Sequence, residues 1–387
     1  MAENGQPKIG INGFGRIGRL FARQVWLKNS AQIVAINDPL LDADAMVYLV
    51  KYDSVHGKFS INIEADGKDA IRVNEVRIPI YACREAAQIP WGACGAVYIA
   101  ETSGHYTTRD KAVLHLQGGA QKVIISAPAN DETIPTFVMG VNECCYCPDM
   151  SVVSNASCTT NCMAPLAKIL HENFGIEEGL MSSIHAVTAS QSCVDGASKK
   201  DYRTGRCFTR NIIPTSTGAA EAVVKVIPDL KGKLTGMAFR VPVENVSVLD
   251  LTCRLHSPMN SIDDLCAILT NIERDSNHPL HSVITCAREP VVSSDFNGDE
   301  HSCIVDIGAC ILLNPTFVKI IAYYDNEWGY ATRLVSRLHC TYQTRYGTYE
   351  SILSIDINRW TSSSACSRQT KQRTIPGSSI ASIQTQA

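Results

Sequence analysis

The first half of the chain alternates short apolar runs with stretches long enough to form helices. Residues 8–11 form such a run and lead into a glycine-rich turn, and residues 17–25 then carry apolar side chains at steps of three and four. This spacing predicts a strand, a turn and a helix with one apolar face. Further strand-like runs lie at residues 33–36, 96–99, 123–126 and 152–153. Strands that alternate with helices predict a mostly parallel sheet.

The pattern changes after Cys158. Two β-rich stretches, 236–251 and 303–324, flank a helix-like segment at residues 261–274. We therefore expect a second domain of α+β type with a mixed or antiparallel sheet, and an α/β fold class for the chain as a whole.

Residues 361–387 consist mainly of Ser, Thr and Gln with almost no large apolar side chains, so this tail is predicted to be largely disordered.

Composition narrows the class of protein. The chain has 387 residues, of which 45% are apolar and 19% charged, as expected of a soluble enzyme with two domains and some appended material. A net charge of -3 gives no signal for nucleic acid or anionic lipid. No signal peptide or membrane-spanning window is evident, so we predict a cytoplasmic protein.

The 16 cysteines are scattered, and most should be reduced thiols. The closest group, Cys144, Cys145 and Cys147, has no second Cys or His pair at zinc-site spacing nearby, so no metal is predicted.

A dinucleotide site is predicted at the glycine turn. Gly13, Gly15 and Gly18 lie between a predicted strand and a predicted helix, and Asp38 follows at the end of the next strand. The glycines would let the backbone approach a pyrophosphate at the helix N-terminus, and the Asp38 carboxylate would bind ribose hydroxyls and repel a 2′-phosphate. The pattern therefore favours NAD over NADP. The alternative is that the glycines form only a turn and Asp38 only a solvated strand end.

Cys158 is the candidate nucleophile. It opens a segment with apolar residues at helical spacing, and a helix N-terminus together with a nearby imidazolium would stabilise a thiolate. His185, at the end of a predicted strand, is the expected partner. The alternative for any cysteine is a small buried apolar residue, which we assign to Cys162, one helical turn later. The hydroxyl and amide neighbours of Cys158 favour a reactive site instead.

These motifs are recognisable together. Segments 12–19, 154–162 and 324–330 resemble those of phosphorylating glyceraldehyde-3-phosphate dehydrogenases, and the resemblance extends over roughly residues 7–340, including 216–220 and 234–242. It implies a homotetramer whose subunits have a Rossmann NAD-binding domain at residues 1–157, completed by a C-terminal helix at about 326–343. A catalytic domain would occupy residues 158–325, followed by an extension at residues 344–387.

The resemblance also assigns roles to individual residues. Cys158 and His185 would be catalytic. The NAD site would comprise Gly13, Gly15, Arg16, Ile17, Gly18, Asp38, Arg84, Ser126 and Asn326. Glyceraldehyde 3-phosphate and inorganic phosphate would be bound by Ser157, Thr159, Thr188, Ser190, Thr217, Gly218 and Arg240. The implied reaction forms a thiohemiacetal and then a thioester on Cys158, which phosphate cleaves to 1,3-bisphosphoglycerate.

The sequence also departs from the family pattern. Ser190 replaces a usual threonine, Ala197 a usual proline and Glu221 a common lysine, and the carboxylate of Glu221 would lower phosphate affinity. About four extra residues lie near 275–278, and the C-terminal extension has no usual counterpart. Two alternatives stay open: an erythrose-4-phosphate dehydrogenase, and a catalytically weakened paralogue that acts as a nucleotide-binding or interaction protein.

Overall fold

The computed structural model describes residues 6–198 and 201–346; most of the predicted extension, including the predicted disordered tail, lies outside these residues. The first of its two sheets has the strand order β3-β4-β5-β2-β1-β6-β7-β8. Its strands are β1 (Lys8–Asn12), β2 (Gln32–Asn37), β3 (Ile63–Ala65), β4 (Ala70–Val73), β5 (Val76–Tyr81), β6 (Tyr98–Glu101), β7 (Lys122–Ile125) and β8 (Val152–Ser154). From β5 to β8 every neighbouring pair is parallel.

This sheet matches the predicted strands to within a few residues. Strand β1 lies inside the sheet between two parallel neighbours, and four of its five residues are buried, as expected of a parallel strand whose two faces are covered by other elements. The antiparallel strands β3 and β4 at one edge were not predicted, because they are short and alternate only weakly. Helices α1 (Arg16–Lys28) and α2 (Ala43–Lys51) follow β1 and β2.

The second sheet is mixed and lies beyond Cys158. Its main path has the order β10-β11-β9-β12-β16-β14-β13, with β15 paired to β16. The strands are β9 (Ile176–His185), β10 (Ile213–Ser216), β11 (Leu234–Arg240), β12 (Ser247–Leu255), β13 (Ile284–Ala287), β14 (Cys303–Asp306), β15 (Ile311–Asn314) and β16 (Phe317–Tyr324). Helices α5 (Cys158–Phe174), α6 (Ala219–Val226) and α7 (Ile262–Arg274) pack in the same half of the molecule.

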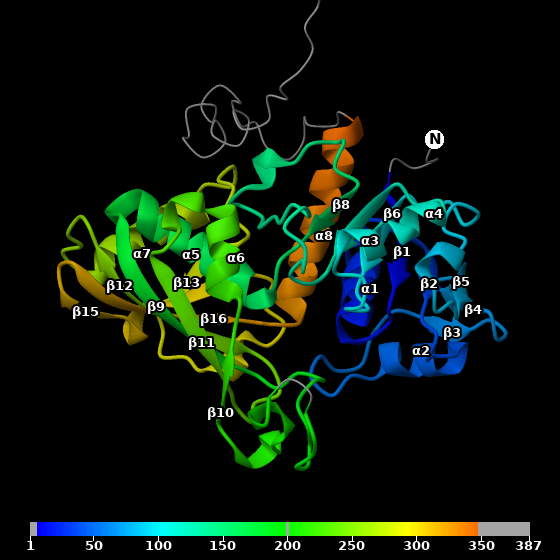
Figure 1. Cartoon of the computed structure of the whole chain (residues 1–387), viewed down its shortest axis with the longest axis horizontal. Coiled ribbons are helices and arrows are strands. Elements are labelled where there is room, and N and C mark those ends of the chain that lie inside the picture. The colour runs from blue at the N-terminus through cyan, green and yellow to red at the C-terminus, as the bar shows by residue number, and fades with distance from the viewer. Residues whose placement is uncertain (1–5, 199–200, 347–387) are drawn as a thin grey trace, which may run out of the picture.

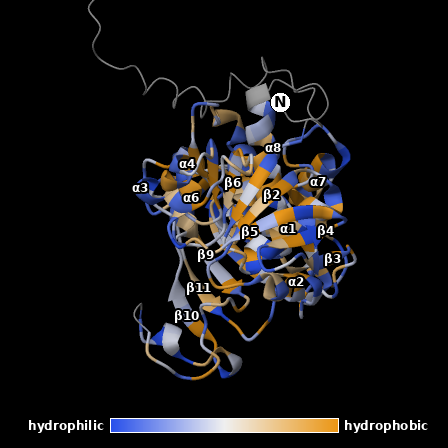
Figure 2. Cartoon of the chain, turned by 90° about the vertical axis from the view of Figure 1, so that its right-hand side faces the viewer, coloured by the Kyte–Doolittle hydropathy of each residue, from blue (hydrophilic) through white to orange (hydrophobic). Residues whose placement is uncertain are grey.

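Helix α8 (Trp328–Tyr346) connects the two halves. It packs against α1 and α5, so the chain's last described helix lies between the two sheets (Figure 1). Two short helices, α3 (Arg109–Ala112) and α4 (Leu114–Gln117), cover the first sheet. Apolar residues concentrate along the strands, as Figure 2 shows around β2, and helices α1, α2 and α8 contribute apolar side chains to the same core. The predicted fold class, α/β with a second α+β unit, is confirmed.

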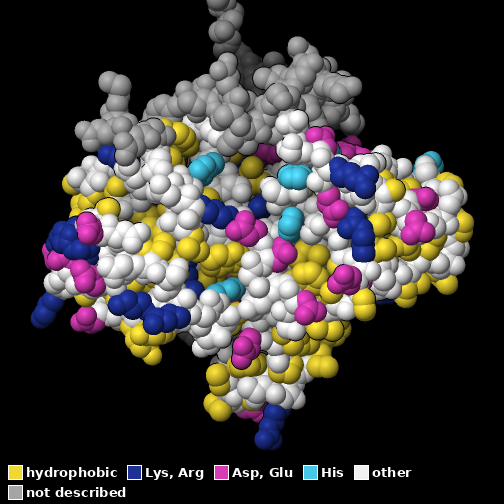
Figure 3. Space-filling model, turned by 180° about the vertical axis from the view of Figure 1, so that it is seen from behind, with side chains coloured by type: hydrophobic (Ala, Val, Ile, Leu, Met, Phe, Trp, Pro, Cys, Tyr) yellow, Lys and Arg dark blue, Asp and Glu magenta, His cyan; other side chains and the backbone are white. Residues whose placement is uncertain are grey.

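The surface gives two further findings. Positive and negative side chains are interspersed over the face seen in Figure 3, which shows no broad area of one charge. Within residues 6–198 and 201–346, no helix is long and apolar enough to cross a bilayer, and no three His, Cys, Asp or Glu side chains are grouped to hold a metal ion.

Candidate active site

At two positions of the glycine turn, Gly13 and Gly18, any side chain would clash with neighbouring backbone atoms. Gly13 has φ +86°, and a Cβ there would lie 2.6 Å from the backbone of Ser103. A Cβ at Gly18 would lie 2.2 Å from the Gly13 carbonyl oxygen. At Gly15, by contrast, a Cβ would meet no atom within 4 Å, so open space lies beside the turn. Two glycines therefore allow the fold, and the third leaves room for a ligand.

The start of α1 suits an anion. Its N-cap, Gly15, supplies no side-chain hydrogen bond, so the first-turn N–H groups of Arg16 and Ile17 are left for a ligand. Asp38 is brought to the same turn: its carboxylate accepts hydrogen bonds from the Phe14 N–H at 2.8 Å and the Leu40 N–H at 2.9 Å. These groups fit a dinucleotide with its pyrophosphate at the helix start and its ribose beside Asp38.

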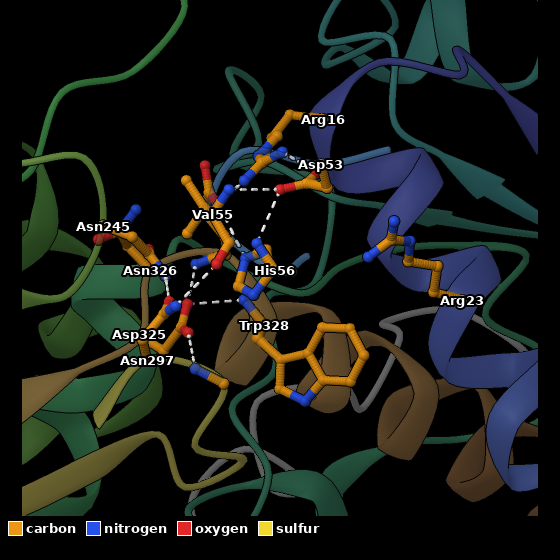
Figure 4. A network of polar contacts seen from close by, with 12 residues as sticks. Arg16, Arg23, Asp53, Val55, His56, Asn245, Asn297, Asp325, Asn326 and Trp328 are labelled. Atoms are coloured by element: carbon orange, nitrogen blue, oxygen red, sulfur yellow. Dashed lines mark hydrogen bonds and ion pairs between the residues drawn. The ribbon is translucent and has the colours of Figure 1, made fainter. Parts of the chain in front are cut away.

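The Arg16 side chain has a different role from its backbone. Its guanidinium forms ion pairs with Asp53 and, at 2.5 Å, with Glu327, whose carboxylate also lies 3.0 Å from His56 Nε2. Figure 4 shows Asp53 beside Arg16, and His56 between Asp53 and the pair Asp325 and Asn326. Although burial opposes the effect, His56 and Arg16 lower the pKa of Glu327. The Arg16 guanidinium therefore ties the glycine turn to the start of α8, and only its N–H remains for the cofactor.

Asn326 is positioned by a residue that the sequence analysis missed. Its Oδ1 accepts a hydrogen bond of 2.7 Å from the Ser247 hydroxyl, which in turn accepts one of 3.0 Å from the Ala186 N–H. Ser247 thus connects Asn326 with the residue after His185. The side chains of two other predicted cofactor residues are not held by hydrogen bonds in the described part of the chain: Ser126 Oγ is buried without a partner there, and the Arg84 side chain is exposed.

Cys158 begins α5, as predicted. Ser157 is the N-cap, and its hydroxyl accepts a hydrogen bond of 3.1 Å from the Thr160 N–H. Cys158 Sγ lies 3.4 Å from His185 Nε2, at the end of β9, while Cys162 is fully buried. The helix start and the strand end therefore bring together two residues far apart in sequence.

Burial opposes the predicted thiolate and imidazolium in this structure. Burial raises the pKa of the Cys158 thiol, and the hydrogen bonds from Thr159 and the charge of Arg240 oppose this only in part. Burial and the charge of Arg240 lower the pKa of His185 to about 4. Desolvation outweighs the helix N-terminus here, so the pair at neutral pH is a thiol beside a neutral imidazole. A neutral imidazole can still accept the thiol proton.

Arg240 lies next to the pair. Its Nη1 is 2.6 Å from His185 Nδ1 and 3.2 Å from the Ala186 carbonyl oxygen. It also lines a cavity of about 340 Å³ with Ser190 and several hydroxyl-bearing residues, as well as Ala197. The Thr188 hydroxyl lies 3.1 Å from that of Ser190 and donates to Gln191 Oε1. A guanidinium among hydroxyls suits a phosphate group.

The other predicted phosphate-binding residues differ in where their polar groups point. Thr217 Oγ1 accepts a hydrogen bond of 3.2 Å from the Ala219 N–H, and the N-cap of α6, Gly218, has no side-chain cap. Glu221 is exposed in the first turn of α6. The Thr159 hydroxyl, however, points inward and lies 2.8 Å from the buried Tyr324 hydroxyl, so it does not face solvent.

Comparisons with known proteins identify the family. Residues 7–109 match the family model of the glyceraldehyde 3-phosphate dehydrogenase NAD binding domain, and residues 157–326 match that of the C-terminal domain. The chain is 53% identical over 330 residues to a cytosolic glyceraldehyde-3-phosphate dehydrogenase of Chondrus crispus, covering 85% of this chain and 96% of that protein. The chain belongs to the glyceraldehyde-3-phosphate dehydrogenase family.

Other relatives agree with this assignment. A chloroplastic glyceraldehyde-3-phosphate dehydrogenase of Arabidopsis thaliana is 52% identical over 334 residues, covering 86% of this chain and 78% of that protein. Glyceraldehyde-3-phosphate dehydrogenase B of Aspergillus oryzae is 52% identical over 328 residues, covering 85% and 96%. The predicted family and the predicted cofactor, NAD, are confirmed.

Within this glyceraldehyde-3-phosphate dehydrogenase fold, Tyr324 is a second residue that was missed. Its hydroxyl lies 2.8 Å from Thr159 Oγ1 and 3.0 Å from Ser183 Oγ, and its ring packs edge-on against His185 with centroids 6.0 Å apart. Burial alternates along β16, and Tyr324 lies on the buried side of the strand. Its contact with Thr159 depends on the arrangement of the sheet and is not visible in the sequence.

Proposed function

We propose that this chain oxidises glyceraldehyde 3-phosphate to 1,3-bisphosphoglycerate with inorganic phosphate, while reducing NAD, through a thioester on Cys158. The observation that carries the proposal is the 3.4 Å approach of Cys158 Sγ to His185 Nε2 at the start of α5. The NAD-binding match and the named relatives support the same reaction.

The chemistry begins with the thiol. The sulfur of Cys158 bonds to the aldehyde carbon while its proton passes through His185 to the carbonyl oxygen, giving a thiohemiacetal. His185 then removes the hydroxyl proton as a general base. Bound NAD supplies the acceptor for the hydride that leaves the same carbon. The resulting thioester is attacked by phosphate, which breaks the C–S bond and releases the acyl phosphate.

The position of Arg240 allows substrate binding to decide which ring nitrogen of His185 carries the proton. His185 Nδ1 lies 2.7 Å from the Ala186 carbonyl oxygen, to which it donates when it carries the proton, leaving Nε2 free to accept. When Arg240 donates to Nδ1, Nε2 instead carries hydrogen toward the sulfur. A substrate phosphate that draws Arg240 away from the imidazole selects the first form, so substrate binding would activate the base.

The remaining roles follow from position. We assign the substrate phosphate to Arg240, Thr188 and Ser190, and the attacking phosphate to Thr217 and Gly218, with main-chain groups of Ser157 and Thr159. The pyrophosphate of NAD would bind the N–H groups of the first turn of α1, its ribose Asp38, and its carboxamide Asn326. The residues proposed for the cofactor are Gly13, Gly15, Arg16, Ile17, Gly18, Asp38, Arg84, Ser126 and Asn326.

Assembly, location and domain boundaries are part of the proposal. We assign residues 1–157 with the helix at 326–343 to the NAD-binding domain, and residues 158–325 to the catalytic domain, because α5 begins at Cys158. The family resemblance supports a homotetramer. The cytosolic relative supports a cytoplasmic location. The chloroplastic relative supports the alternative, a location in an organelle.

One assay tests the proposal. NADH formation from glyceraldehyde 3-phosphate is measured with and without phosphate, and erythrose 4-phosphate is compared as the aldehyde. Phosphate-dependent turnover that prefers glyceraldehyde 3-phosphate supports the proposed reaction. A preference for erythrose 4-phosphate supports the rival dehydrogenase, and binding of NAD without turnover supports the weakened paralogue that Ala197 and Glu221 suggest.

A further inference from the structure

A second cavity, lined by apolar side chains together with several titratable ones, lies away from Cys158. It has a volume of about 390 Å³ and is bordered by α8, the end of α1 and the segment 276–283, which includes part of the stretch without a usual family counterpart. None of the residues assigned above to the cofactor or substrate lines it. Its lining includes the cationic or titratable residues Lys28, Glu143, His278, His281, Arg333 and His339.

Arg333 is the unusual member. It is only 3% exposed, and the structure gives its guanidinium no hydrogen bond or ion pair within the described part of the chain. Burial lowers the pKa of Arg333 to about 10, so the group remains charged at neutral pH. A buried charge without a partner is costly, and such groups are normally paired or hydrogen-bonded. The nearby Glu300 carboxylate partly offsets the effect of burial on the pKa of Arg333, but Glu300 forms its ion pair with Lys28 and makes no hydrogen bond to Arg333 within the described part of the chain.

The other polar side chains in the cavity lining supply further hydrogen-bond donors and little negative charge. His339 Nε2 is buried without a hydrogen-bond partner among the residues that the structure describes. His278 Nδ1 accepts a hydrogen bond of 3.1 Å from the Leu280 N–H, which leaves its Nε2 as a donor. Lys28 is already paired with Glu300 at 2.8 Å. The carboxyl group in the lining, Glu143, has its pKa raised by burial, which favours its neutral form.

We propose that this cavity binds a phosphate-class oxyanion, held by the Arg333 guanidinium and by imidazole N–H groups of His339 and His278. A guanidinium offers several donors in a fixed plane, which matches the oxygens of such an anion. The cavity is large enough for a phosphate carried on a small metabolite as well as for the free ion. The site is independent of the proposed catalytic function.

Equilibrium dialysis of the full chain against radiolabelled inorganic phosphate tests the site. The wild type is compared with Arg333→Gln and with Arg274→Gln, which removes an exposed arginine from the end of α7. Because the catalytic site is also proposed to bind phosphate, Arg240→Gln and the double variant Arg240→Gln/Arg333→Gln are included. We expect Arg333→Gln to bind one phosphate fewer per chain than the wild type and Arg274→Gln to match the wild type. The double variant should lose the Arg333 and Arg240 sites and keep only the phosphate position proposed at Thr217 and Gly218.

A second readout separates binding from folding. In phosphate-free buffer, Arg333→Gln should unfold at no lower temperature than the wild type, because it removes a buried charge that has no hydrogen-bonded partner in the described part of the chain. Phosphate should raise the unfolding temperature of Arg333→Gln less than that of the wild type, because only the proposed active-site phosphate positions remain. If Arg333→Gln fails to fold, His339→Gln serves instead, with an expected loss of roughly tenfold in affinity for the same class of site. Superimposable phosphate isotherms for the wild type and a folded Arg333→Gln or His339→Gln variant overturn the proposal.

Discussion

Two helix N-termini contribute to the proposed active site, and they are built differently. Helix α1 starts at a glycine with no side-chain cap, so its first N–H groups remain open. Helix α5 starts at Ser157, whose hydroxyl satisfies the Thr160 N–H, and it presents the Cys158 sulfur. The first terminus is suited to hold an anion, whereas the second satisfies its own backbone and positions a reactive group. A helix N-terminus thus serves ligand binding in α1 and positions the reactive sulfur in α5.

The comparison predicts that Cys158→Ser abolishes most of the NADH formation and leaves NAD binding intact. A serine hydroxyl is a far weaker nucleophile and forms no thioester, so NADH formation should fall by about a thousandfold or more. NAD affinity should stay near that of the wild type, because the glycine turn is untouched. Progress curves and NAD titrations measure the two quantities. A variant with wild-type turnover would show that the sulfur is not the reacting group.

The two glycines at the start of α1 should respond in opposite ways. Gly13→Ala forces a side chain onto φ +86° and into the Ser103 backbone, and should cost about 3 kcal/mol of unfolding free energy. Gly15→Ala meets no atom of the protein and should change stability by less than about 0.5 kcal/mol while weakening NAD binding. Urea unfolding and NAD titration of both variants test this. Equal destabilisation would contradict the distinction between folding and binding glycines.

The start of α5 predicts a pH-dependent stability. Because the pKa of His185 is lowered to about 4, the unfolded chain binds a proton between about pH 6.5 and 4 that the folded chain does not. Stability should therefore fall by up to about 3 kcal/mol as the pH decreases through this window. Urea unfolding at several pH values should show a shallower decrease for His185→Asn. The exposed His256→Asn is the matched control and should keep the wild-type slope.

The smallest expected effect is loss of the α5 cap. Ser157→Ala leaves the Thr160 N–H without its partner and should cost about 1 kcal/mol, seen as a lower unfolding temperature. Ser157→Asp, which can still cap the helix, should recover most of this loss. An unchanged unfolding temperature in Ser157→Ala would mean that the cap contributes nothing to α5.

The sequence predicted the parts of the site that depend on local spacing. The glycine turn, Asp38 and the start of α5 at Cys158 all follow from residues near one another in the chain. Asp38 reaches the turn because β1 and β2 are parallel neighbours whose ends coincide. Such arrangements are visible in a periodic pattern before any coordinates are known.

The rest depends on long-range packing. The Arg16 guanidinium turns toward Glu327, and the Thr159 hydroxyl toward Tyr324, only because distant segments meet there. The helix start and the nearby imidazole favour a Cys158 thiolate, whereas burial raises the pKa of the thiol, and this burial is set by the whole fold and not by the neighbouring residues. Sequence patterns indicate which groups are present, whereas burial decides their charge.

The most direct test looks for the covalent intermediate itself. The chain is mixed with glyceraldehyde 3-phosphate and NAD without phosphate, quenched with acid, digested and analysed by mass spectrometry. We predict an acyl adduct on the peptide that contains Cys158, which disappears when phosphate is added before the quench. An adduct on another cysteine, or steady NADH formation with no adduct on any peptide, would contradict the proposed mechanism.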